Sequence, residues 1–372
     1  MPASPSIYRP ELTGLRAVAV GIVLVQHWVR PAFPLGELGP SLFFVLSGYL
    51  ISGIIWQCGA SPGVPGPWLR RMGTFYLRRL LRIGPCYYLA LAGCVLLPLA
   101  AVREHFAWFL LWGANLFIYH ARGWPDGIGH LWTIAVEAQF YLLWPWVLGL
   151  LGPRRKPLLA VVALSWLFRI GWSGWARPDM VHLLLPASLD LFALGAVLRL
   201  GPESGWPKRL VRGRYVLLAW LGWVALRTGA GTGPWAQAAA LVQHPWLALA
   251  CFVTIGWLLR GGAGPRRLGL GHPAMQWVGQ RSYSIYLFHL PLLVAWQRLV
   301  YHFVPAAGLR AACLKPVPVV LVLGPLVALL SAAAWQWIEL PIDRYKSRLR
   351  YAEAVPATPA TGKGQLRDIA GE

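Results

Sequence analysis

Long apolar stretches alternate with short polar stretches along the whole chain of 372 residues. Most of the apolar stretches approach the roughly 20 residues that a helix needs to cross about 30 Å of hydrocarbon. Because lipid offers no hydrogen-bond partners, segments of this kind are expected to be helices. The candidate segments lie at 12–29, 39–57, 83–101, 105–120, 130–151, 157–174, 182–200, 215–228, 236–259, 282–304 and 316–338. The pattern predicts an all-α, polytopic transmembrane helix bundle.

The composition supports this class, since 57% of the residues are apolar and only 13% are charged. The net charge of +21 comes largely from Lys and Arg in short loops between the apolar segments. That placement is typical of the positive-inside rule, so we interpret the charge as membrane topology and not as nucleic-acid binding. We expect a membrane-embedded domain at 1–345 and a short polar cytoplasmic tail at 346–372.

The segment 105–120 is the weakest candidate span, because it is short, is flanked by His105 and His120 and contains Asn115. If it does not cross, most of the Lys and Arg residues fall on one side of the membrane, as the positive-inside rule requires. We therefore expect about ten spanning helices with both termini in the cytoplasm. The segment itself is predicted to be a short re-entrant or interfacial helix on the outer side.

Arg16 and His27 lie on the first apolar segment with ten residues between them. Eleven helical steps of about 100° bring the chain to within about 20° of its starting direction, so both side chains are predicted on one face, about 16 Å apart. Ionisable groups inside a bilayer are costly and usually functional. The alternative is that Arg16 only snorkels at the end of the helix.

A second basic group precedes the third apolar segment. Arg79 and Arg82 are three residues apart and share a helix face, and Arg70, Arg71 and Arg78 lie close to them in the sequence. Guanidinium groups bind phosphate oxygens in a bidentate manner. The spacing therefore predicts a phosphate-binding cluster on the cytoplasmic side.

His130 and Glu137 begin and centre the stretch HLWTIAVEAQFYLLWP at 130–145. Their separation of seven residues places them on one helix face, about 10 Å apart. An intramembrane carboxylate is expected to have a His or Arg partner on a neighbouring helix. The alternative role for Glu137 is an ion pair that only fixes helix packing.

In their order and spacing, these motifs resemble the bacterial acyltransferase 3 family of integral membrane O-acyltransferases. Thr13 stands where such proteins commonly carry Asp, and Ser41 stands where they carry an acidic residue before the Phe-Phe pair. No hydrolase-like domain follows the last predicted helix, so a stand-alone membrane module is expected. The motifs are YRPELTGLRAVAVGIVLVQH at 8–27, SLFFVLSGYLIS at 41–52, the Arg-x-x-Arg of 79–82, the stretch 130–145, LDLFALGAVL at 189–198, RSYSIYLFHLP at 281–291 and IELP at 338–341.

The resemblance implies an enzyme of the bacterial cytoplasmic (inner) membrane that transfers an acyl group, expected to be acetyl, from cytoplasmic acyl-CoA. The acceptor would be a hydroxyl of an envelope, lipid-linked or secreted glycan. The CoA phosphates would be bound by Arg16, Arg79 and Arg82. His27 would be the general base, oriented by Glu137.

The remaining candidates are assigned on the same resemblance. His130 would bind substrate or replace His27 as the base. Ser47, Tyr283 and Ser284 are candidate donors for the developing oxyanion. Asp190 and His289 either line the central cavity or lock helices together by hydrogen bonds.

Neither a metal nor a permanently bound cofactor is expected, since the histidines form no HxxxH or HExxH pair and the five cysteines form no CxxC pair. Acyl-CoA is the expected co-substrate, and the expected partners are the glycan acceptor and membrane lipid. Three alternatives are a transporter or flippase of a lipid-linked sugar, a non-catalytic scaffold, and an acyltransferase whose acceptor is a macrolide-type natural product. The flippase hypothesis predicts internal repeats with broken helices, and the sequence shows no convincing repeat.

Overall fold

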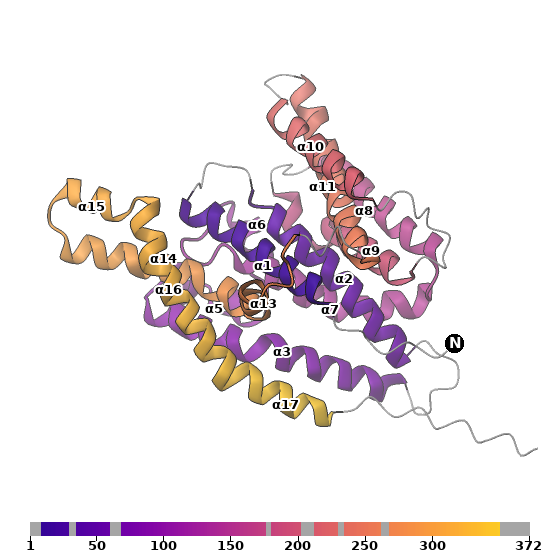
Figure 1. Ribbon diagram of the computed structural model, residues 1–372, viewed down its shortest axis with the longest axis horizontal. Coiled ribbons are helices and arrows are strands. Elements are labelled where there is room, and N and C mark those ends of the chain that lie inside the picture. The colour runs from indigo at the N-terminus through magenta and orange to yellow at the C-terminus, as the bar shows by residue number, and fades with distance from the viewer. Residues whose placement is uncertain are drawn as a thin grey trace, which may run out of the picture.

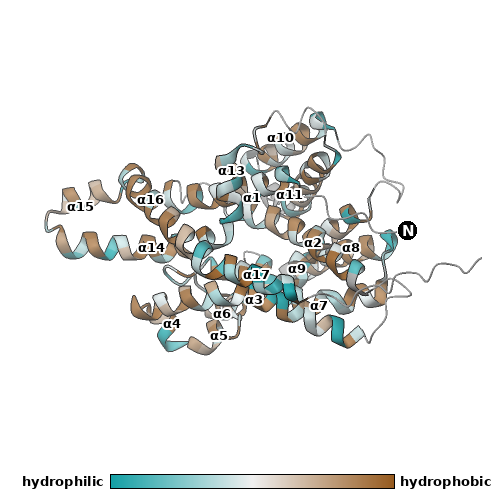
Figure 2. Ribbon diagram, turned by 60° about the horizontal axis from the view of Figure 1, so that its bottom comes forward, coloured by the Kyte–Doolittle hydropathy of each residue, from teal (hydrophilic) through white to brown (hydrophobic). Residues whose placement is uncertain are grey.

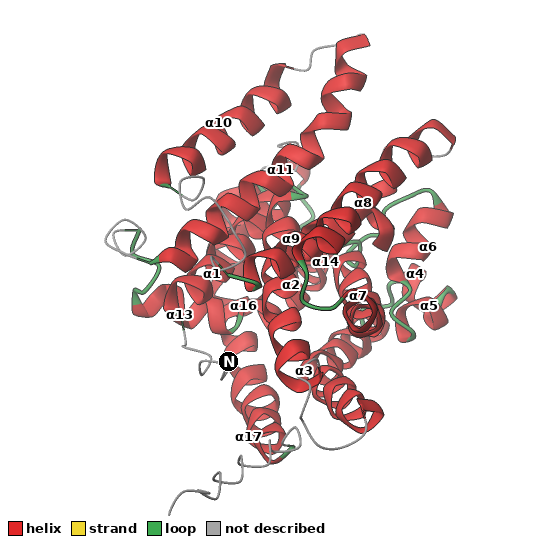
Figure 3. Ribbon diagram, turned by 90° about the vertical axis from the view of Figure 1, so that its right-hand side faces the viewer, coloured by secondary structure: helices red, strands yellow, loops and turns green. Residues whose placement is uncertain are grey.

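The computed structural model describes residues 9–29, 35–59, 68–175, 180–201, 212–229, 234–261 and 268–349. Within these ranges every regular element is a helix and none is a strand (Figure 3), which confirms the all-α prediction. The predicted tail comprises residues 346–372, and its residues from 350 onward lie outside the described part of the chain. In chain order the main elements are α1 (Pro10–Leu24), the π-helix η1 (Val25–Val29), α2 (Leu38–Gly59), α3 (Trp68–Leu96), α4 (Ala100–Glu104), α5 (Phe106–Leu110), α6 (Ala114–Ala121), α7 (Leu131–Leu151), α8 (Arg155–Trp175), η2 (Val181–Leu183), α9 (Leu185–Arg199), α10 (Gly213–Gly229), α11 (Pro234–Arg260), α13 (Pro273–Gln280), α14 (Ser282–Phe303), α15 (Ala307–Cys313), α16 (Pro316–Ala334), the π-helix η4 (Trp335–Glu339) and α17 (Leu340–Arg348).

Six helices in the described part of the chain are long and apolar enough to cross a membrane, so the count of ten is not confirmed. Helices α9 and α10 have 15 and 17 residues, which is short for a bilayer. Helix α14 has 22 residues, but His289, Gln297 and Arg298 interrupt its apolar character. The six candidate spans are Pro10–Val29, Leu38–Gln57, Trp68–Leu96, Leu131–Leu151, Leu241–Arg260 and Pro316–Arg348.

The weak segment 105–120 is broken into parts of α5 and α6, the longer of which has eight residues. Eight residues of α-helix rise only about 12 Å, so neither piece crosses a bilayer alone. Asn115 is fully buried and fastens α6 to its neighbours. Its amide donates to the carbonyl of Leu183 at 2.9 Å, and the amide of Gln139 on α7 donates to its oxygen at 2.9 Å.

Two helix boundaries differ from the sequence prediction. Helix α3 begins at Trp68, 15 residues before the predicted span at 83–101, so Arg79 and Arg82 lie inside a helix and not at its start. Helix α17 continues to Arg348, past the predicted domain boundary at 345. Both extensions are amphipathic, and a search for continuous apolar runs does not detect amphipathic helices.

Helix α2 lies at the centre of the bundle and packs against α1, α7, α9 and α11 (Figure 1). The contact with α9 is close because both sides present glycine. A Cβ added to Gly48 would overlap the backbone of Phe192, and one added to Gly195 would overlap the backbone of Val45. The ring of Phe192 then stacks on Phe140 of α7 with centroids 3.8 Å apart. Small residues at such crossings allow the close helix approach that is common in membranes.

Helices α16 and α17 form one continuous edge of the molecule (Figure 1). Figure 2 shows α16 as mainly apolar and α17 as mainly polar. On α16, Leu321 and Leu329 are 69% and 68% exposed, as expected for side chains that face lipid. The change in polarity at α17 suits a helix that leaves the hydrocarbon and enters an interface.

Candidate functional site

Two cavities of opposite chemistry lie at the centre of the bundle. We call them the arginine cavity and the histidine cavity, and they share the lining residues Pro40 and Tyr286. The polar lining of the arginine cavity is Arg16, Ser47, Arg79, Arg82, Thr133, Glu137, Tyr141, Ser282, Tyr283, Tyr286, Asp343 and Lys346. The polar and aromatic lining of the histidine cavity includes Gln26, His27, Glu37, Trp124, Asp126, His130, Trp132, Arg169, His182, Trp223, Arg227, Gln243, His244 and Tyr286.

Helices α1 and α7 pass from one cavity to the other. The first helix contributes Arg16 to the arginine cavity, and its π-helical extension η1 contributes His27 to the histidine cavity. Helix α7 is capped by His130 at the histidine cavity and presents Glu137 two turns later to the arginine cavity. The two cavities are therefore stacked along the helix axes, and a ligand in one cavity can meet a ligand in the other near Tyr286.

The three predicted arginines converge in the arginine cavity. Within the described residues, Arg16 and Arg79 have no hydrogen-bond or ion-pair partner, although the Arg79 guanidinium lies 6.0 Å from the ring centroid of Tyr141. Arg82 forms ion pairs with Glu339 at 3.2 Å and with Asp343 at 3.9 Å. Two partially buried guanidinium groups that form no hydrogen bond or ion pair have the chemistry that suits an anion.

Glu137 lies among the arginines and does not orient His27. Its Oε1 atom accepts hydrogen bonds from Ser47 at 2.6 Å and from Tyr141 at 2.5 Å. The predicted pairing of Glu137 with His27 is therefore wrong in this structure. The physical reason is depth, because two turns of α7 separate Glu137 from the histidine cavity.

Two further lining residues of this cavity were not predicted from the sequence. Lys346 and Asp343 lie on α17 and form an ion pair that lines the arginine cavity. Lys346 is only 9% exposed, although it falls in the predicted tail. The amphipathic pattern of α17 is the signal that could have revealed them.

His27 pairs with His289 and not with a carboxylate. The Nδ1 atom of His289 lies 2.6 Å from the carbonyl oxygen of Tyr286, which can only accept, so this nitrogen carries a proton. In neutral His289 the other nitrogen, Nε2, is then an acceptor, and it lies 3.0 Å from Nδ1 of His27. His27 therefore donates from Nδ1 and keeps Nε2 as its basic nitrogen.

The change from α-helix to π-helix at Val25 alters the direction of His27. The predicted shared face with Arg16 assumed an uninterrupted α-helix, and this geometry ends at Leu24. A π-helix has i→i+5 hydrogen bonds, so its side chains point in other directions than those of an uninterrupted α-helix. Such turns are often found at functional sites. The turn brings His27 beside the fully buried His289, with ring centroids 4.9 Å apart.

His130 lies in the same group of rings but has another partner. Its Nε2 atom is 3.2 Å from the carbonyl oxygen of Leu287, and its ring centroid is 4.8 Å from that of His289. Its Nδ1 atom is buried and has no hydrogen-bond partner in the described part of the chain. Because Nε2 donates to a carbonyl, neutral His130 presents an unpaired acceptor.

The hydroxyl groups that were predicted to stabilise an oxyanion are already engaged. Ser47 donates to Glu137, Tyr283 donates to the carbonyl of Ile83 at 2.6 Å, and Ser284 donates to Glu339. Ser47 and Tyr283 line the arginine cavity, whereas Ser284 is fully buried and lines neither of the two cavities.

Asp190 and His289 are buried partners of histidines that line the histidine cavity. Neither of the two lines either cavity. The Oδ2 atom of Asp190 accepts from Nε2 of His244 at 3.0 Å and from Nε1 of Trp166 at 2.8 Å. Each residue thus locks helices by hydrogen bonds and at the same time fixes the orientation of a histidine.

Glu37, His182 and His244 were also missed by the sequence analysis, because they come from separate elements with no fixed spacing. Glu37 immediately precedes α2. In the part of the chain that the structure describes, no group of three His, Cys, Asp or Glu side chains has the arrangement of a metal site.

A family described as "Acyltransferase domain" matches residues 9–336 of the chain. The peptidoglycan O-acetyltransferase OatA of Listeria monocytogenes is 24% identical over 351 aligned positions, gaps included, and the alignment covers 77% of this chain and 49% of that protein. The O-acetyltransferase OatA of Staphylococcus aureus is 25% identical over 400 aligned positions, gaps included, and the alignment covers 91% of this chain and 57% of that protein. The chain thus spans about half the length of these relatives. No solved structure matches it.

Proposed function

Since the chain belongs to the acyltransferase 3 family of membrane acyltransferases, we propose that it transfers an acetyl group from cytoplasmic acetyl-CoA to a hydroxyl of an envelope glycan. One observation carries the proposal: a cavity with unpaired arginines meets a cavity with an oriented histidine at Tyr286. The first cavity suits the phosphates of CoA, and the second suits a neutral, hydroxyl-bearing acceptor. The names of the relatives make peptidoglycan the first acceptor to test.

In this proposal Arg16 and Arg79 bind the phosphates of the donor. Arg82 contributes less, because Glu339 and Asp343 already neutralise much of its charge. The thioester end of the donor would extend toward Tyr286, where the two cavities meet. Exclusion of water from this junction would protect the thioester from hydrolysis.

His27 would act as the general base. Its Nε2 atom takes the proton of the acceptor hydroxyl while the hydroxyl oxygen attacks the carbonyl carbon of the thioester. The carbon–sulfur bond then breaks, the acyl–oxygen bond remains, and the CoA thiolate leaves and receives the proton from His27. His289 would hold His27 in the required tautomer, as its hydrogen bond to Nδ1 indicates.

The function also requires an orientation in the membrane. We propose that the arginine cavity faces the cytoplasm of a bacterial cell and that both termini lie there. In a variant without native cysteines, a cysteine at position 153, after α7, should then react only with reagents that reach the cytoplasm. A cysteine at position 305, after α14, should react from outside the cell. The opposite labelling pattern would contradict this orientation.

The direct test uses the purified chain in lipid nanodiscs with [14C]acetyl-CoA and peptidoglycan fragments that lack O-acetyl groups. Transfer of label to an alkali-labile ester on the glycan, lost in His27→Ala, would support the proposal. Absence of transfer to these fragments and to lipid-linked and secreted glycans would contradict it. His302→Ala is the matched control, because His302 is exposed and lines neither cavity.

A further inference from the structure

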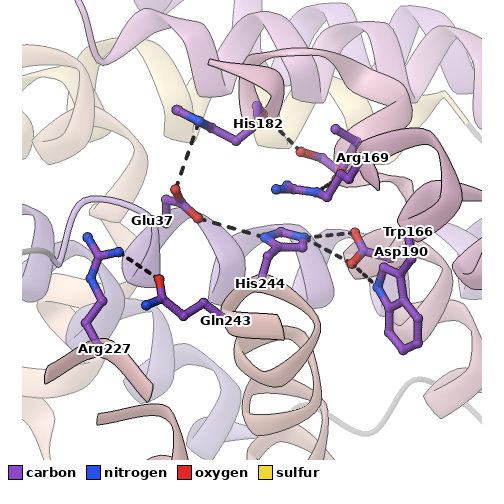
Figure 4. A network of polar contacts seen from close by, with 10 residues as sticks. Glu37, Trp166, Arg169, His182, Asp190, Arg227, Gln243 and His244 are labelled. Carbon is purple, nitrogen blue, oxygen red and sulfur yellow. Dashed lines mark hydrogen bonds and ion pairs between the residues drawn. The ribbon is translucent and has the colours of Figure 1, made fainter. Parts of the chain in front are cut away.

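A network of charged side chains forms a second polar centre in the histidine cavity, apart from the pair of His27 and His289. Figure 4 shows the carboxylate of Glu37 between the imidazoles of His182 and His244, with Asp190 on the side of His244 opposite Glu37. The Glu37 oxygens lie 4.0 Å from Nδ1 of His182 and 3.8 Å from Nδ1 of His244. Both distances are too long for a direct hydrogen bond.

The tautomer of His244 follows from its buried partner. Its Nε2 atom lies 3.0 Å and 3.3 Å from the two oxygens of Asp190, which is fully buried, so Nε2 carries the proton. The Nδ1 atom of neutral His244 is then an acceptor. His244 is only 7% exposed, and this Nδ1 atom has no hydrogen-bond partner in the described part of the chain, although the ring lines the cavity.

A buried acceptor without a donor is unfavourable unless a ligand supplies one. Glu37 offers a second acceptor on the same side of the cavity, so the pair suits a ligand with two neighbouring O–H donors. The charges on the lining point to a neutral ligand, because Arg169 and Arg227 balance Glu37 and Asp126.

The aromatic side chains of the same lining suit a sugar ring. Trp124, Trp132 and Trp223 line the same cavity, which has a volume of about 690 Å³. Indole rings combine a broad apolar face with a polar edge, which suits stacking against the apolar face of a sugar. A cavity of this size is within the range of sites for small ligands.

We propose that Glu37 and Nδ1 of His244 accept hydrogen bonds from two hydroxyl groups of a neutral sugar ring of the acceptor. Asp190 is the positioning residue that holds His244 in the accepting tautomer. The proposal rests on the function proposed above and specifies how the acceptor is oriented, because the same cavity contains His27. Binding two hydroxyls at Glu37 and His244 would decide which further hydroxyl reaches the base.

The test measures sugar binding and transfer separately on the full chain in nanodiscs. The probe is the neutral tetrasaccharide of β-1,4-linked N-acetylglucosamine, with binding followed by calorimetry and transfer followed with [14C]acetyl-CoA. Glu37→Gln and His244→Gln should each weaken tetrasaccharide affinity and raise its KM by about tenfold, because Glu37→Gln replaces a charged acceptor by a weaker neutral one and His244→Gln removes the acceptor nitrogen that Asp190 positions. The KM for acetyl-CoA should change less than about twofold. Glu104→Gln and His302→Gln are the matched controls, since both residues are exposed and line neither cavity.

Asp190→Asn distinguishes positioning from a merely structural role. It should raise the KM for the tetrasaccharide in the wild-type background but have no further effect in the His244→Gln background. A loss of the same size in both backgrounds would overturn the positioning role. If Asp190→Asn does not fold, the result with Glu37→Gln still decides the site, because the Glu37 side chain is 46% exposed.

The outcomes separate this proposal from the proposed function. If the wild type transfers acetyl groups and Glu37→Gln and His244→Gln keep its KM for the sugar, the sugar site is wrong and the acyltransferase proposal stands. If the wild type binds the tetrasaccharide, the two variants do not, and no glycan is acetylated, the sugar site stands and the acyltransferase proposal is wrong. Binding of anionic muropeptides without binding of the neutral tetrasaccharide would overturn the neutral-sugar assignment.

Discussion

The two central cavities handle their polar groups in opposite ways. In the arginine cavity, Arg16 and Arg79 have no hydrogen-bond or ion-pair partner among the described residues, so their positive charge is not neutralised by an ion pair. In the histidine cavity the charged groups of the lining balance, and His27 and His244 are each fixed by a fully buried neighbour. The unpaired cations of one cavity suit the binding of an anion, whereas buried neighbours in the other cavity hold imidazoles in defined tautomers.

The two cavities are therefore expected to contribute to different steps, one to the binding of a ligand and the other to proton transfer. Unpaired charges contribute mainly to binding, because an anion gains their full interaction. An oriented neutral imidazole contributes little to binding but can take a proton at a defined atom. Substitutions in the two cavities should therefore change different kinetic constants.

The largest effect is expected from His27→Ala, which removes the proposed base. The turnover number should fall by about 100- to 10,000-fold, the usual contribution of general acid–base catalysis. The dissociation constant of acetyl-CoA should stay within about twofold, because His27 does not line the arginine cavity. Both constants are measured on the purified protein, with His302→Ala as the control. An equal loss of turnover and donor affinity would remove the distinction between the two cavities.

The next largest effect is expected from Arg16→Ala and Arg79→Ala, which remove the unpaired cations. Each should weaken acetyl-CoA binding by about 10- to 100-fold, as expected for a charged hydrogen bond worth about 1.5–3 kcal/mol. Folding should be little affected, because neither side chain loses a hydrogen bond or an ion pair, and Arg79 loses only its contacts with the rings of Phe75 and Tyr141. Binding is measured by calorimetry, and Arg103→Ala is the control, since Arg103 is exposed on α4. Unchanged donor affinity in both variants would show that the cavity does not bind CoA.

Arg82→Ala should affect folding more than Arg79→Ala, although both arginines line one cavity. Without Arg82, Glu339 keeps the hydrogen bond from Ser284 but loses its ion pair. The Glu339 side chain is only 3% exposed. A buried carboxylate that loses its cationic partner destabilises a protein by about 3–5 kcal/mol, so the melting temperature should fall. The double variant Arg82→Ala, Glu339→Gln should recover most of this loss. Thermal unfolding in detergent measures it, and equal melting temperatures for the two single variants would contradict the assignment of different roles.

The sequence predicted the arginine cavity better than the histidine cavity. Within one helix, residue spacing reports which side chains share a face, so Arg79 and Arg82 could be grouped before the structure was known. The bond between His27 and His289 joins residues 262 positions apart, and no local pattern encodes it. The π-helical turn that begins at Val25 also moves His27 out of the register that α-helical spacing assumes.

The same limitation explains the wrong partner for His27. Glu137 was assigned to it because a buried carboxylate and an imidazole commonly pair, but spacing along α7 does not report how that helix is shifted relative to α1. Glu37 was missed because it lies in a turn before α2, where no periodicity applies. Apolar segments predicted the helical class well, but they could not predict helix ends with amphipathic character, such as α17 with Lys346.

The smallest effect is expected from Tyr141→Phe, and it tests why a carboxylate can lie among unpaired arginines at all. Tyr141 and Ser47 both donate to Oε1 of Glu137, so the carboxylate is satisfied without an arginine. Without the Tyr141 hydroxyl, Glu137 should turn toward the cations and compete with the donor phosphates. Loss of one hydrogen bond, worth about 0.5–1.5 kcal/mol, corresponds to a two- to tenfold loss of acetyl-CoA affinity.

A second background decides whether this competition is the cause. In Glu137→Gln the neutral amide cannot neutralise an arginine, so Tyr141→Phe should no longer change acetyl-CoA affinity by more than about twofold. If the loss is the same in both backgrounds, Tyr141 contacts the donor directly, and the hydrogen bonds to Glu137 do not preserve the charge of the cavity. If the loss disappears, the arginine cavity keeps its unpaired cations because hydroxyl groups hold its one central carboxylate away from them.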